Sequence, residues 1–187
     1  MSELLERVAE FSKKAHEGQF DKGGHPYYLH PQCVANMGTT EDEKIVGYLH
    51  DVIEDTKYTI DDIKALGVND RCIEAIKCLT HDKSIPYDEY VANIKKCELA
   101  RKVKMNDLKN NMDISRLKTV TPKDLERVEK YKKSYAFLEK KFSCVALSMF
   151  YVFYQLVIKW KCEGVNCNGW KENLLYWRWC KWSKKRI

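Results

Sequence analysis

Two kinds of pattern are missing from this sequence: no stretch alternates between apolar and polar residues over a useful length, and no segment repeats. Alternation with period two is typical of half-buried β-strands. Repeats at a fixed period are typical of solenoids and propellers. The sequence therefore predicts neither a β-sheet protein nor a repeat protein. What it does contain is apolar residues at helical spacing.

Features of secreted proteins are missing as well. The N-terminal segment MSELLERVAEFSKKAHEG lacks the apolar core of a signal peptide. The eight cysteines show no spacing typical of a disulfide framework. Four of them stand at helix-like positions, namely Cys33, Cys72, Cys78 and Cys97. We therefore expect reduced, half-buried thiols in a cytoplasmic protein.

Excess charge is absent from most of the chain and gathers in its last part. Residues 1–141 contain 25 Lys and Arg against 25 Asp and Glu, whereas residues 142–187 contain 8 against 2. All five Trp also lie in residues 142–187. The overall composition, 44% hydrophobic and 32% charged, is that of a folded globular protein. The sequence therefore predicts two parts, a charge-balanced domain over 1–141 and a basic, aromatic extension over 142–187.

Helical spacing of apolar residues runs through residues 1–141, and capping signals mark where helices begin. Leu4, Val8 and Phe11 share one face, and Gly18 stands where that helix would stop. Thr40 to Glu43 reads as a capping box, and Thr121 followed by proline reads as another helix start. We expect helices over roughly 4–17, 31–37, 41–55, 59–66, 71–79, 87–97, 99–108 and 121–141. The predicted fold class is all-α.

The segment Leu49 to Thr56 carries four ionisable side chains among apolar ones: His50, Asp51, Glu54 and Asp55. On a helix, His50 and Glu54 share one face, and Asp51 and Asp55 share another. Such groups packed together repel each other or lose solvation unless a cation lies among them. A divalent metal resolves this, and imidazole with carboxylates favours Mn, Fe or Mg. An exposed charged face with one hydrogen-bonded histidine is the alternative that spacing leaves open.

Two further segments offer ligands for such a metal. His30 lies at the mouth of an expected helix, directly before Pro31, and Asp107 lies late in another. Spacing alone does not show that these residues converge on His50 and Asp51.

Four stretches together resemble a known family. They are AHEGQFDKGGHPYYLHP, GYLHDVIEDT, ALGV followed by CLT, and ARKVKMNDLKNNMD. In this order they resemble the hydrolase domain of RelA/SpoT-type enzymes and the small alarmone hydrolases of the HD superfamily. The match covers roughly Leu4 to Arg116. It implies an HD-domain helical bundle that hydrolyses a nucleotide phosphate with a bound metal, expected to be Mn²⁺.

The resemblance also implies roles for individual residues. The implied metal ligands are His30, His50, Asp51 and Asp107. Glu54 is implied as the general base for the attacking water, and Asp55 as its support or as the acid for the leaving oxygen. The implied substrate-binding residues are Lys22, Lys104 and Asn111.

One position departs from the family pattern. Asp21 stands where the alarmone hydrolases carry an Arg that stacks on guanine, and a carboxylate makes no cation–π contact. We expect a guanosine 3′,5′-bis(diphosphate) 3′-pyrophosphohydrolase with a raised KM, and an Arg at this position should lower that KM. Another nucleotide, such as NADPH with its 2′-phosphate, is the alternative substrate. A catalytically silent HD module that binds a nucleotide is the alternative outside enzymes. Nothing resembles a synthetase domain, and we expect no nucleic acid partner.

The extension over 142–187 allows three interpretations. Residues 142–158 carry no charge, and their length is at the lower limit for a membrane-spanning helix. They could form a buried helix against the domain or a second subunit, or they could contact a membrane with the Trp-rich basic end beside it. The third interpretation is an aberrant extension joined to a truncated domain.

Overall fold

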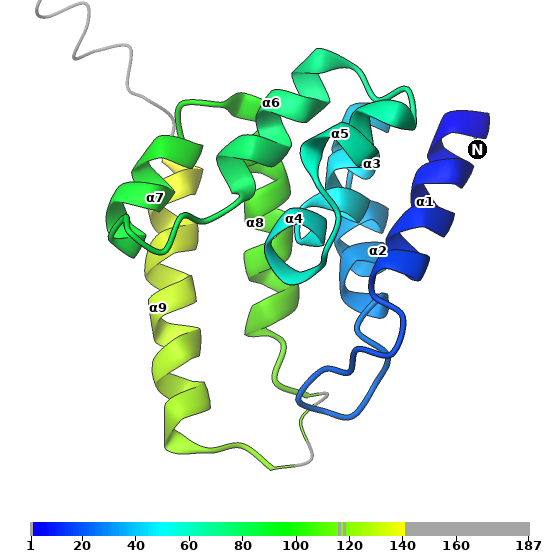
Figure 1. Ribbon diagram of the computed structural model, residues 1–187. Coiled ribbons are helices and arrows are strands. Elements are labelled where there is room, and N and C mark those ends of the chain that lie inside the picture. Colours follow the sequence, from blue (N-terminus) through cyan, green and yellow to red (C-terminus); the bar gives the residue numbers. More distant parts are fainter. Residues whose placement is uncertain (1, 116, 118, 141–187) are drawn as a thin grey trace, which may run out of the picture. The chain divides into compact units, whose positions relative to one another are not determined.

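The computed structural model describes residues 2–115, 117 and 119–140. Among these residues the secondary structure is helical, apart from turns, loops and an isolated antiparallel bridge between Phe20 and Pro26. In chain order the helices are α1 (Glu3–Ala15), α2 (Leu29–Asn36), α3 (Glu41–Leu49), α4 (Val52–Asp55), α5 (Ile60–Ala65), α6 (Asp70–Leu79), α7 (Tyr87–Ile94), α8 (Glu98–Met112) and α9 (Pro122–Glu139). Figure 1 shows α8 in the interior of the bundle, with α9 beside it. The all-α prediction is confirmed.

Side-chain caps determine where several helices begin. Thr59 and Thr121 begin α5 and α9 with reciprocal capping boxes. The box predicted at Thr40 forms only in part. Its hydroxyl accepts from the backbone N–H of Glu43, but Oε2 of Glu43 accepts from the backbone N–H and the hydroxyl of Thr39 instead. The helix still begins where the capping signal predicts, because the orphan N–H groups of its first turn find side-chain oxygens.

The helix expected over 41–55 is interrupted in its middle, so the prediction that His50, Asp51, Glu54 and Asp55 share one helix was wrong. His50 is the C-cap of α3, and Asp51 is the N-cap of α4. At Asp51, φ is −100° and ψ is −6°. In a continuous helix, neighbouring side chains point about 100° apart. The break instead lets the side chains of His50 and Asp51 meet.

A close approach of two helices brings the parts of the site together. A Cβ added to Gly47 in α3 would lie 2.7 Å from the Cα of Ala35 in α2, which leaves no room for any side chain there. The two helices therefore pack backbone to backbone, with Val34 and Val46 buried beside the contact. As a result, the rings of His30 and His50 lie with their centroids 5.2 Å apart.

Helix α8 completes the core on the other side of this pair. Its apolar face, formed by Leu99, Ala100, Val103 and Leu108, is buried. Packing of α8 against both α2 and α3 carries Asp107 to the end of α3. The described cysteines are free thiols; Cys33, Cys78 and Cys97 are half-buried as predicted, whereas Cys72 is fully buried.

None of the helices in the described part of the chain combines the length and the apolar character needed to cross a bilayer. Residues 142–187 lie outside the described residues. The three interpretations of that extension, and the division of the chain at residue 141, therefore stay predictions.

Candidate active site

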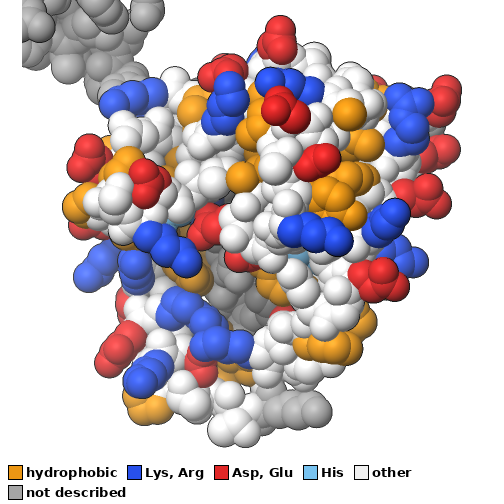
Figure 2. Space-filling view, viewed as in Figure 1, with side chains coloured by type: hydrophobic (Ala, Val, Ile, Leu, Met, Phe, Trp, Pro, Cys, Tyr) orange, Lys and Arg blue, Asp and Glu red, His pale blue; other side chains and the backbone are white. Residues whose placement is uncertain are grey.

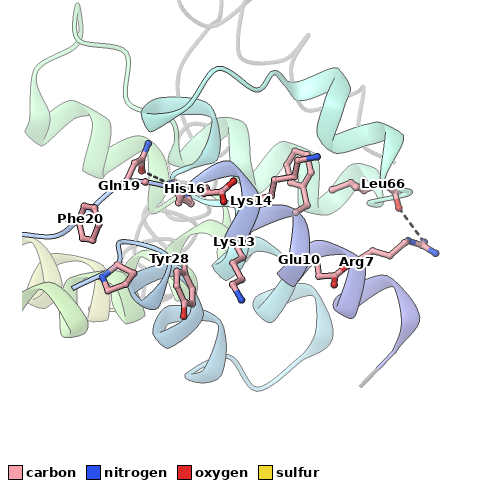
Figure 3. Close-up of a pocket in the computed structure, with 13 residues that line it drawn as sticks. Arg7, Glu10, Lys13, Lys14, His16, Gln19, Phe20, Tyr28 and Leu66 are labelled. Carbon is pink, nitrogen blue, oxygen red and sulfur yellow. Dashed lines mark hydrogen bonds between the residues drawn. The ribbon is translucent and has the colours of Figure 1, made fainter. Parts of the chain in front are cut away.

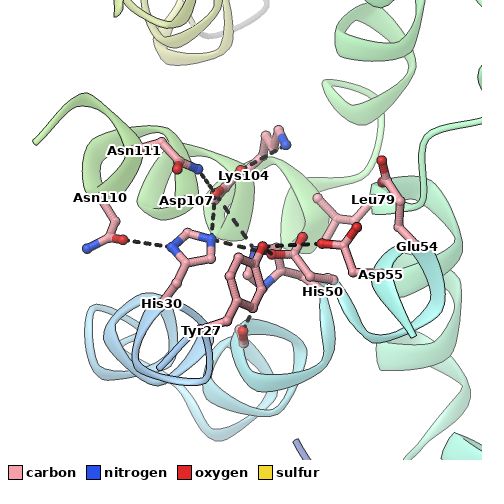
Figure 4. Close-up of polar contacts among 12 residues, drawn as sticks. Tyr27, His30, His50, Glu54, Asp55, Leu79, Lys104, Asp107, Asn110 and Asn111 are labelled. Atoms are coloured by element: carbon pink, nitrogen blue, oxygen red, sulfur yellow. Dashed lines mark hydrogen bonds and ion pairs between the residues drawn. The ribbon is translucent and has the colours of Figure 1, made fainter. Parts of the chain in front are cut away.

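Four of the residues singled out in the sequence converge from three segments: His30 from α2, His50 and Asp51 from the α3–α4 junction, and Asp107 from α8. Nε2 of His30 lies 3.2 Å from Oδ1 of Asp107 and 3.4 Å from Oδ2 of Asp51. Nε2 of His50 lies 3.1 Å from Oδ2 of Asp51 and 3.8 Å from Oδ1 of Asp107. Figure 4 shows the side chains of His30, His50 and Asp107 pointing toward one another. We call these four residues the His–Asp cluster.

Both histidines are oriented by hydrogen bonds at the opposite side of the ring. Nδ1 of His30 donates to Oδ1 of Asn110 at 2.7 Å, and Nδ1 of His50 donates to the carbonyl of Gly47 at 2.8 Å. Since these acceptors require a proton on Nδ1, each ring can present the lone pair of Nε2 to the cluster. Within the described residues, the buried Nε2 of His50 makes no hydrogen bond. An oriented imidazole nitrogen that faces carboxylates without a well-aligned hydrogen bond suits a metal ligand.

The donor set fits a divalent metal ion. One ligand atom each from His30, His50 and Asp107 lie within 4.8 Å of one another, and all three residues are buried. Asp51 adds a second carboxylate at the distances given above. Two imidazoles and two carboxylates form a mixed N/O ligand set. Such a set suits Mn, Fe or Mg better than a metal ion that prefers thiolate ligands.

The electrostatics of the cluster also favour a cation. Burial lowers the pKa of both histidines, but the carboxylates of Asp51 and Asp107 outweigh burial and raise the pKa of His30 to about 9 and of His50 to about 10. Burial raises the pKa of Asp51 and Asp107, but neighbouring cations, His50 for Asp51 and Lys104 for Asp107, hold each well below its usual range. The cluster therefore holds positive charge, either as protons or as a metal ion that displaces them.

The two acidic residues of α4 point in different directions. The hydroxyl of Tyr27 lies 2.8 Å from Oδ2 of Asp51 and 3.2 Å from Oδ2 of Asp55, so this hydroxyl links Asp55 to the cluster. Glu54 instead accepts from the backbone N–H of His81 through Oε2 at 3.1 Å. Figure 4 shows Glu54 on the far side of Asp55 from Tyr27. Burial, and then the charge of Asp51, raise the pKa of Asp55.

Lys104 and Asn111 both contact Asp107. Nζ of Lys104 lies 2.8 Å from Oδ2, and Nδ2 of Asn111 donates to Oδ1 at 2.5 Å. The Lys104 side chain is only 15% exposed, and the charge of Asp107 outweighs burial to raise its pKa well above the usual value. These contacts orient Asp107 and balance its charge, whereas the sequence had suggested substrate contacts for both residues. Those substrate contacts stay a prediction.

A pocket of about 220 Å³ opens beside His30. Its lining includes Phe20, Asp21, Lys22, Tyr27, His30, Asn111 and Arg127. Lys22 and Arg127 both lie 3.1 Å from Oδ1 of Asp124, so two cations share one carboxylate. Figure 2 shows both basic and acidic side chains around a hollow in this face of the molecule. Asp21 and Asp113 also line the pocket, so its formal charges balance, and Lys22 and Arg127 are the cations it offers to an anionic group such as a phosphate.

Asp21 has a structural role that the sequence did not suggest. Its Oδ1 accepts from the backbone N–H groups of Gly23 at 2.8 Å and His25 at 2.9 Å, and so closes its own loop. Asp and Asn commonly close turns in this way.

Sequence reasoning missed three residues at the site: Tyr27, Asn110 and Arg127. Tyr27 and Asn110 lie inside the stretches that carried the family resemblance, but neither has a periodicity or a charge that distinguishes it from a core residue. Arg127 lies in a lysine-rich helix, which reads as an ordinary solvated face. Only the contacts of these residues reveal their place at the site.

Comparison with known proteins is consistent with this geometry. No family model matches the chain. A guanosine-3′,5′-bis(diphosphate) 3′-pyrophosphohydrolase of Aquifex aeolicus is 34% identical over 104 residues, which cover 53% of this chain and 15% of that protein. The protein of the same name from Haemophilus influenzae is 42% identical over 57 residues, or 28% of this chain and 8% of that protein. A GTP pyrophosphokinase of Streptomyces coelicolor is 36% identical over 64 residues, or 32% and 8%.

The fold has a counterpart among solved structures. A metazoan ortholog of SpoT, reported to hydrolyse ppGpp, superposes with a TM-score of 0.65 at 22% identity, over 83% of this chain and 96% of that one. The matched regions span 15% or less of the length of these curated relatives. The chain therefore shares the helical fold of this SpoT ortholog, and part of its sequence is similar to part of the curated relatives.

Proposed function

We propose that this chain is a metal-dependent phosphohydrolase that removes the 3′-pyrophosphate from guanosine 3′,5′-bis(diphosphate). The observation that carries the proposal is the convergence of His30, His50, Asp51 and Asp107, with their histidine Nε2 atoms facing the carboxylates. The relatives named as 3′-pyrophosphohydrolases support the choice of substrate.

The His–Asp cluster would hold the metal, and its N/O donors make Mn²⁺ our choice. A divalent ion held there supplies two effects, a lowered pKa of nearby water and polarisation of a phosphoryl oxygen. Each of three ligands already has a hydrogen-bond partner behind it: Asn110 orients His30, the carbonyl of Gly47 orients His50, and Asn111 orients Asp107.

Glu54 and Asp55 would move the protons. Glu54, whose Oε2 here accepts from the N–H of His81, would turn toward the cluster and take a proton from the attacking water, whose oxygen forms a bond to the phosphorus attached to the 3′-oxygen. The bond between that phosphorus and the 3′-oxygen breaks, and Asp55 gives the leaving oxygen its proton. The raised pKa of Asp55 suits a group that carries a proton, and its link to Asp51 through Tyr27 keeps it beside the cluster.

The pocket beside His30 would bind the rest of the nucleotide. Lys22 and Arg127 offer positive charge to the phosphates, and Asn111 offers an amide at the boundary between the pocket and the cluster. Lys104 lies at Asp107 and would offset charge near the reacting phosphoryl group. Each of these residues is already paired with a carboxylate, so substrate phosphates would compete for or share these contacts.

NADPH is a second candidate substrate, because Asp21 supplies no cation to stack on guanine. A screen of both nucleotides decides between them. Metal-free protein is given Mn²⁺, and pyrophosphate release from guanosine tetraphosphate and phosphate release from NADPH are measured. We expect Mn²⁺-dependent pyrophosphate release that is lost in His50→Ala. Phosphate release from NADPH, without pyrophosphate release from guanosine tetraphosphate, would make NADPH the substrate. Binding of a nucleotide without any release would favour the catalytically silent module.

A further inference from the structure

Helix α4, which carries Glu54 and Asp55, is a single turn. Two local hydrogen bonds close it: the N–H of Asp55 donates to the carbonyl of Asp51 at 2.9 Å, and the hydroxyl of Thr56 donates to the carbonyl of Val52 at 2.6 Å. A single helical turn is unstable by itself, and the carbonyls at its end find no partner inside the helix. The position of both acidic residues therefore depends on neighbouring segments.

Gln19 supplies such an anchor from the loop that follows α1. Its Nε2 donates to the main-chain carbonyl of Asp55 at 2.9 Å, and its Oε1 lies 2.8 Å from Nδ1 of His16. Figure 3 shows the bond between Gln19 and His16. A carbonyl can only accept, so the amide NH₂ must face Asp55 and the amide oxygen must face His16. His16 therefore carries a proton on Nδ1, and both side chains have a defined orientation.

His16 also supports the second contact of Asp55. The residue is 1% exposed, and its ring packs against that of Tyr27 with the centroids 5.1 Å apart. Tyr27 in turn places its hydroxyl between Asp51 and Asp55. His16 thus supports Asp55 in two ways. Through Gln19 it holds the main chain of Asp55, and through Tyr27 it holds the Asp55 carboxylate.

The backbone of the loop keeps Gln19 in place. Gly18 has φ of +77°, a backbone conformation that residues other than glycine rarely adopt, and it turns the chain sharply at the end of α1. The N–H of Gln19 then donates to the carbonyl of His16 at 3.1 Å, and the carbonyl of Gln19 accepts from the N–H of Tyr27 at 2.9 Å. The Gln19 side chain is thereby directed toward α4.

We infer that His16 and Gln19 are positioning residues, which hold the main chain of Asp55 so that its carboxylate stays on the Tyr27 hydroxyl beside Asp51. The catalytic consequence rests on the proposed function, whereas the anchoring itself does not. His16 and Gln19 also line a pocket of about 700 Å³ along α1 (Figure 3). A role only as a wall of that pocket is the competing explanation, and it leaves α4 unaffected.

The kinetic test compares Gln19→Leu, which removes both hydrogen bonds, with Glu17→Ala at a neighbouring exposed position. If Gln19 positions Asp55, Gln19→Leu lowers kcat on guanosine tetraphosphate by up to about 10²-fold, the cost of a small misplacement of a reacting group. In Gln19→Leu, KM, Mn²⁺ retention and helical content stay near the wild-type values. Glu17→Ala changes neither kcat nor these three properties. In an Asp55→Asn background, Gln19→Leu should add little, because both changes act on one group. If Gln19→Leu lowers kcat as much in the Asp55→Asn background as in wild type, the inference is overturned.

Hydrogen exchange tests the anchoring without any need for activity. Amides of residues 52–56 should exchange at least several-fold faster in Gln19→Leu than in wild type, and at the wild-type rate in Glu17→Ala. Gln19→Glu keeps the shape of the side chain but loses the amide donor, and it should also speed the exchange of these amides. If wild-type protein cleaves neither nucleotide, the proposed function fails and the exchange rates alone decide the inference. Unchanged exchange in both Gln19 variants contradicts it.

Discussion

Oδ1 of Asn110 lies 2.7 Å from Nδ1 of His30, although the two residues are 80 positions apart in the chain. The amide of Asn110 also donates to Sγ of Cys33 at 3.0 Å, which fixes which way the amide points. Asn110 thus sets the tautomer and the orientation of one predicted metal ligand.

Asn110→Ala should weaken Mn²⁺ binding about 10–100-fold, the usual effect of removing a partner behind a ligating histidine. The reason is that Nδ1 of His30 loses its acceptor, so the ring can rotate and Nε2 no longer faces the cluster. Metal affinity is measured by titration of metal-free protein. Asn93→Ala, at an exposed position on α7, serves as the matched control and should bind Mn²⁺ like wild type. Equal affinity in both variants would mean that His30 is not a ligand.

Removal of a predicted ligand is the more severe change. His50→Ala or Asp51→Ala should abolish both metal retention and phosphohydrolase activity, while circular dichroism still reports a helical fold. His25→Ala is the control, because His25 lies in the loop with its side chain 54% exposed. Metal content after desalting and product release are measured on the same samples. Full activity in either ligand variant would reject the proposed metal site.

Glu54 is proposed as a base and not as a ligand, so its removal should separate chemistry from metal binding. Glu54→Gln should keep the metal but lower the rate about 10²–10⁴-fold, the usual worth of general acid–base catalysis. Glu74→Gln, on the exposed face of α6, should leave the rate unchanged. A loss of metal in parallel with activity would instead make Glu54 a ligand.

The structure adds a cost to Asp21→Arg that the sequence does not show. A stacked guanidinium would add roughly 0.5–2 kcal/mol of binding. The carboxylate it replaces accepts two backbone hydrogen bonds in the loop, and bonds to a charged group contribute about 1.5–3 kcal/mol each. We therefore expect Asp21→Arg to leave KM for guanosine tetraphosphate unchanged or to raise it. Asp21→Asn keeps an acceptor oxygen and should behave like wild type. A lower KM in Asp21→Arg would restore the expectation from sequence.

Glu43 should make stability depend on pH. Burial raises its pKa, but hydrogen bonds from Thr39 and the nearby Lys102 outweigh burial and lower the pKa below its usual value. A carboxylate with a lowered pKa in the folded state stabilises the fold above its unfolded pKa of about 4.3, and this contribution is lost as pH falls through the folded pKa. Glu43→Gln should therefore cost about 1–3 kcal/mol near neutral pH and much less in acid. Urea unfolding of both proteins at several pH values measures the difference. A cost that stays constant with pH would contradict the prediction.

Local sequence predicted the helices well because their signals act over a few residues. Thr59, Thr121 and Gly18 lie where a cap or a stop was expected, since capping and positive φ depend on the chain within one turn. The break between α3 and α4 escaped that reasoning. Residues 41–55 have the composition of one continuous helix, and local propensity does not register the contacts that His50 and Asp51 make with α2 and α8.

The chemical character of the site follows from the sequence by itself: an all-helical chain, a His–Asp pair followed by two acidic residues, and stretches that resemble an HD-type domain. Which residues meet was decided only by tertiary structure. The backbone contact at Gly47 brings α2 onto α3, and α8 then carries Asp107 and Asn110 to His30. The tertiary structure also directs Asp55 toward the cluster and Glu54 away from it, and turns Asp21 into its own loop. The physical reason is that each of these contacts depends on how distant helices and loops pack, and periodicity along one helix carries no information on that packing.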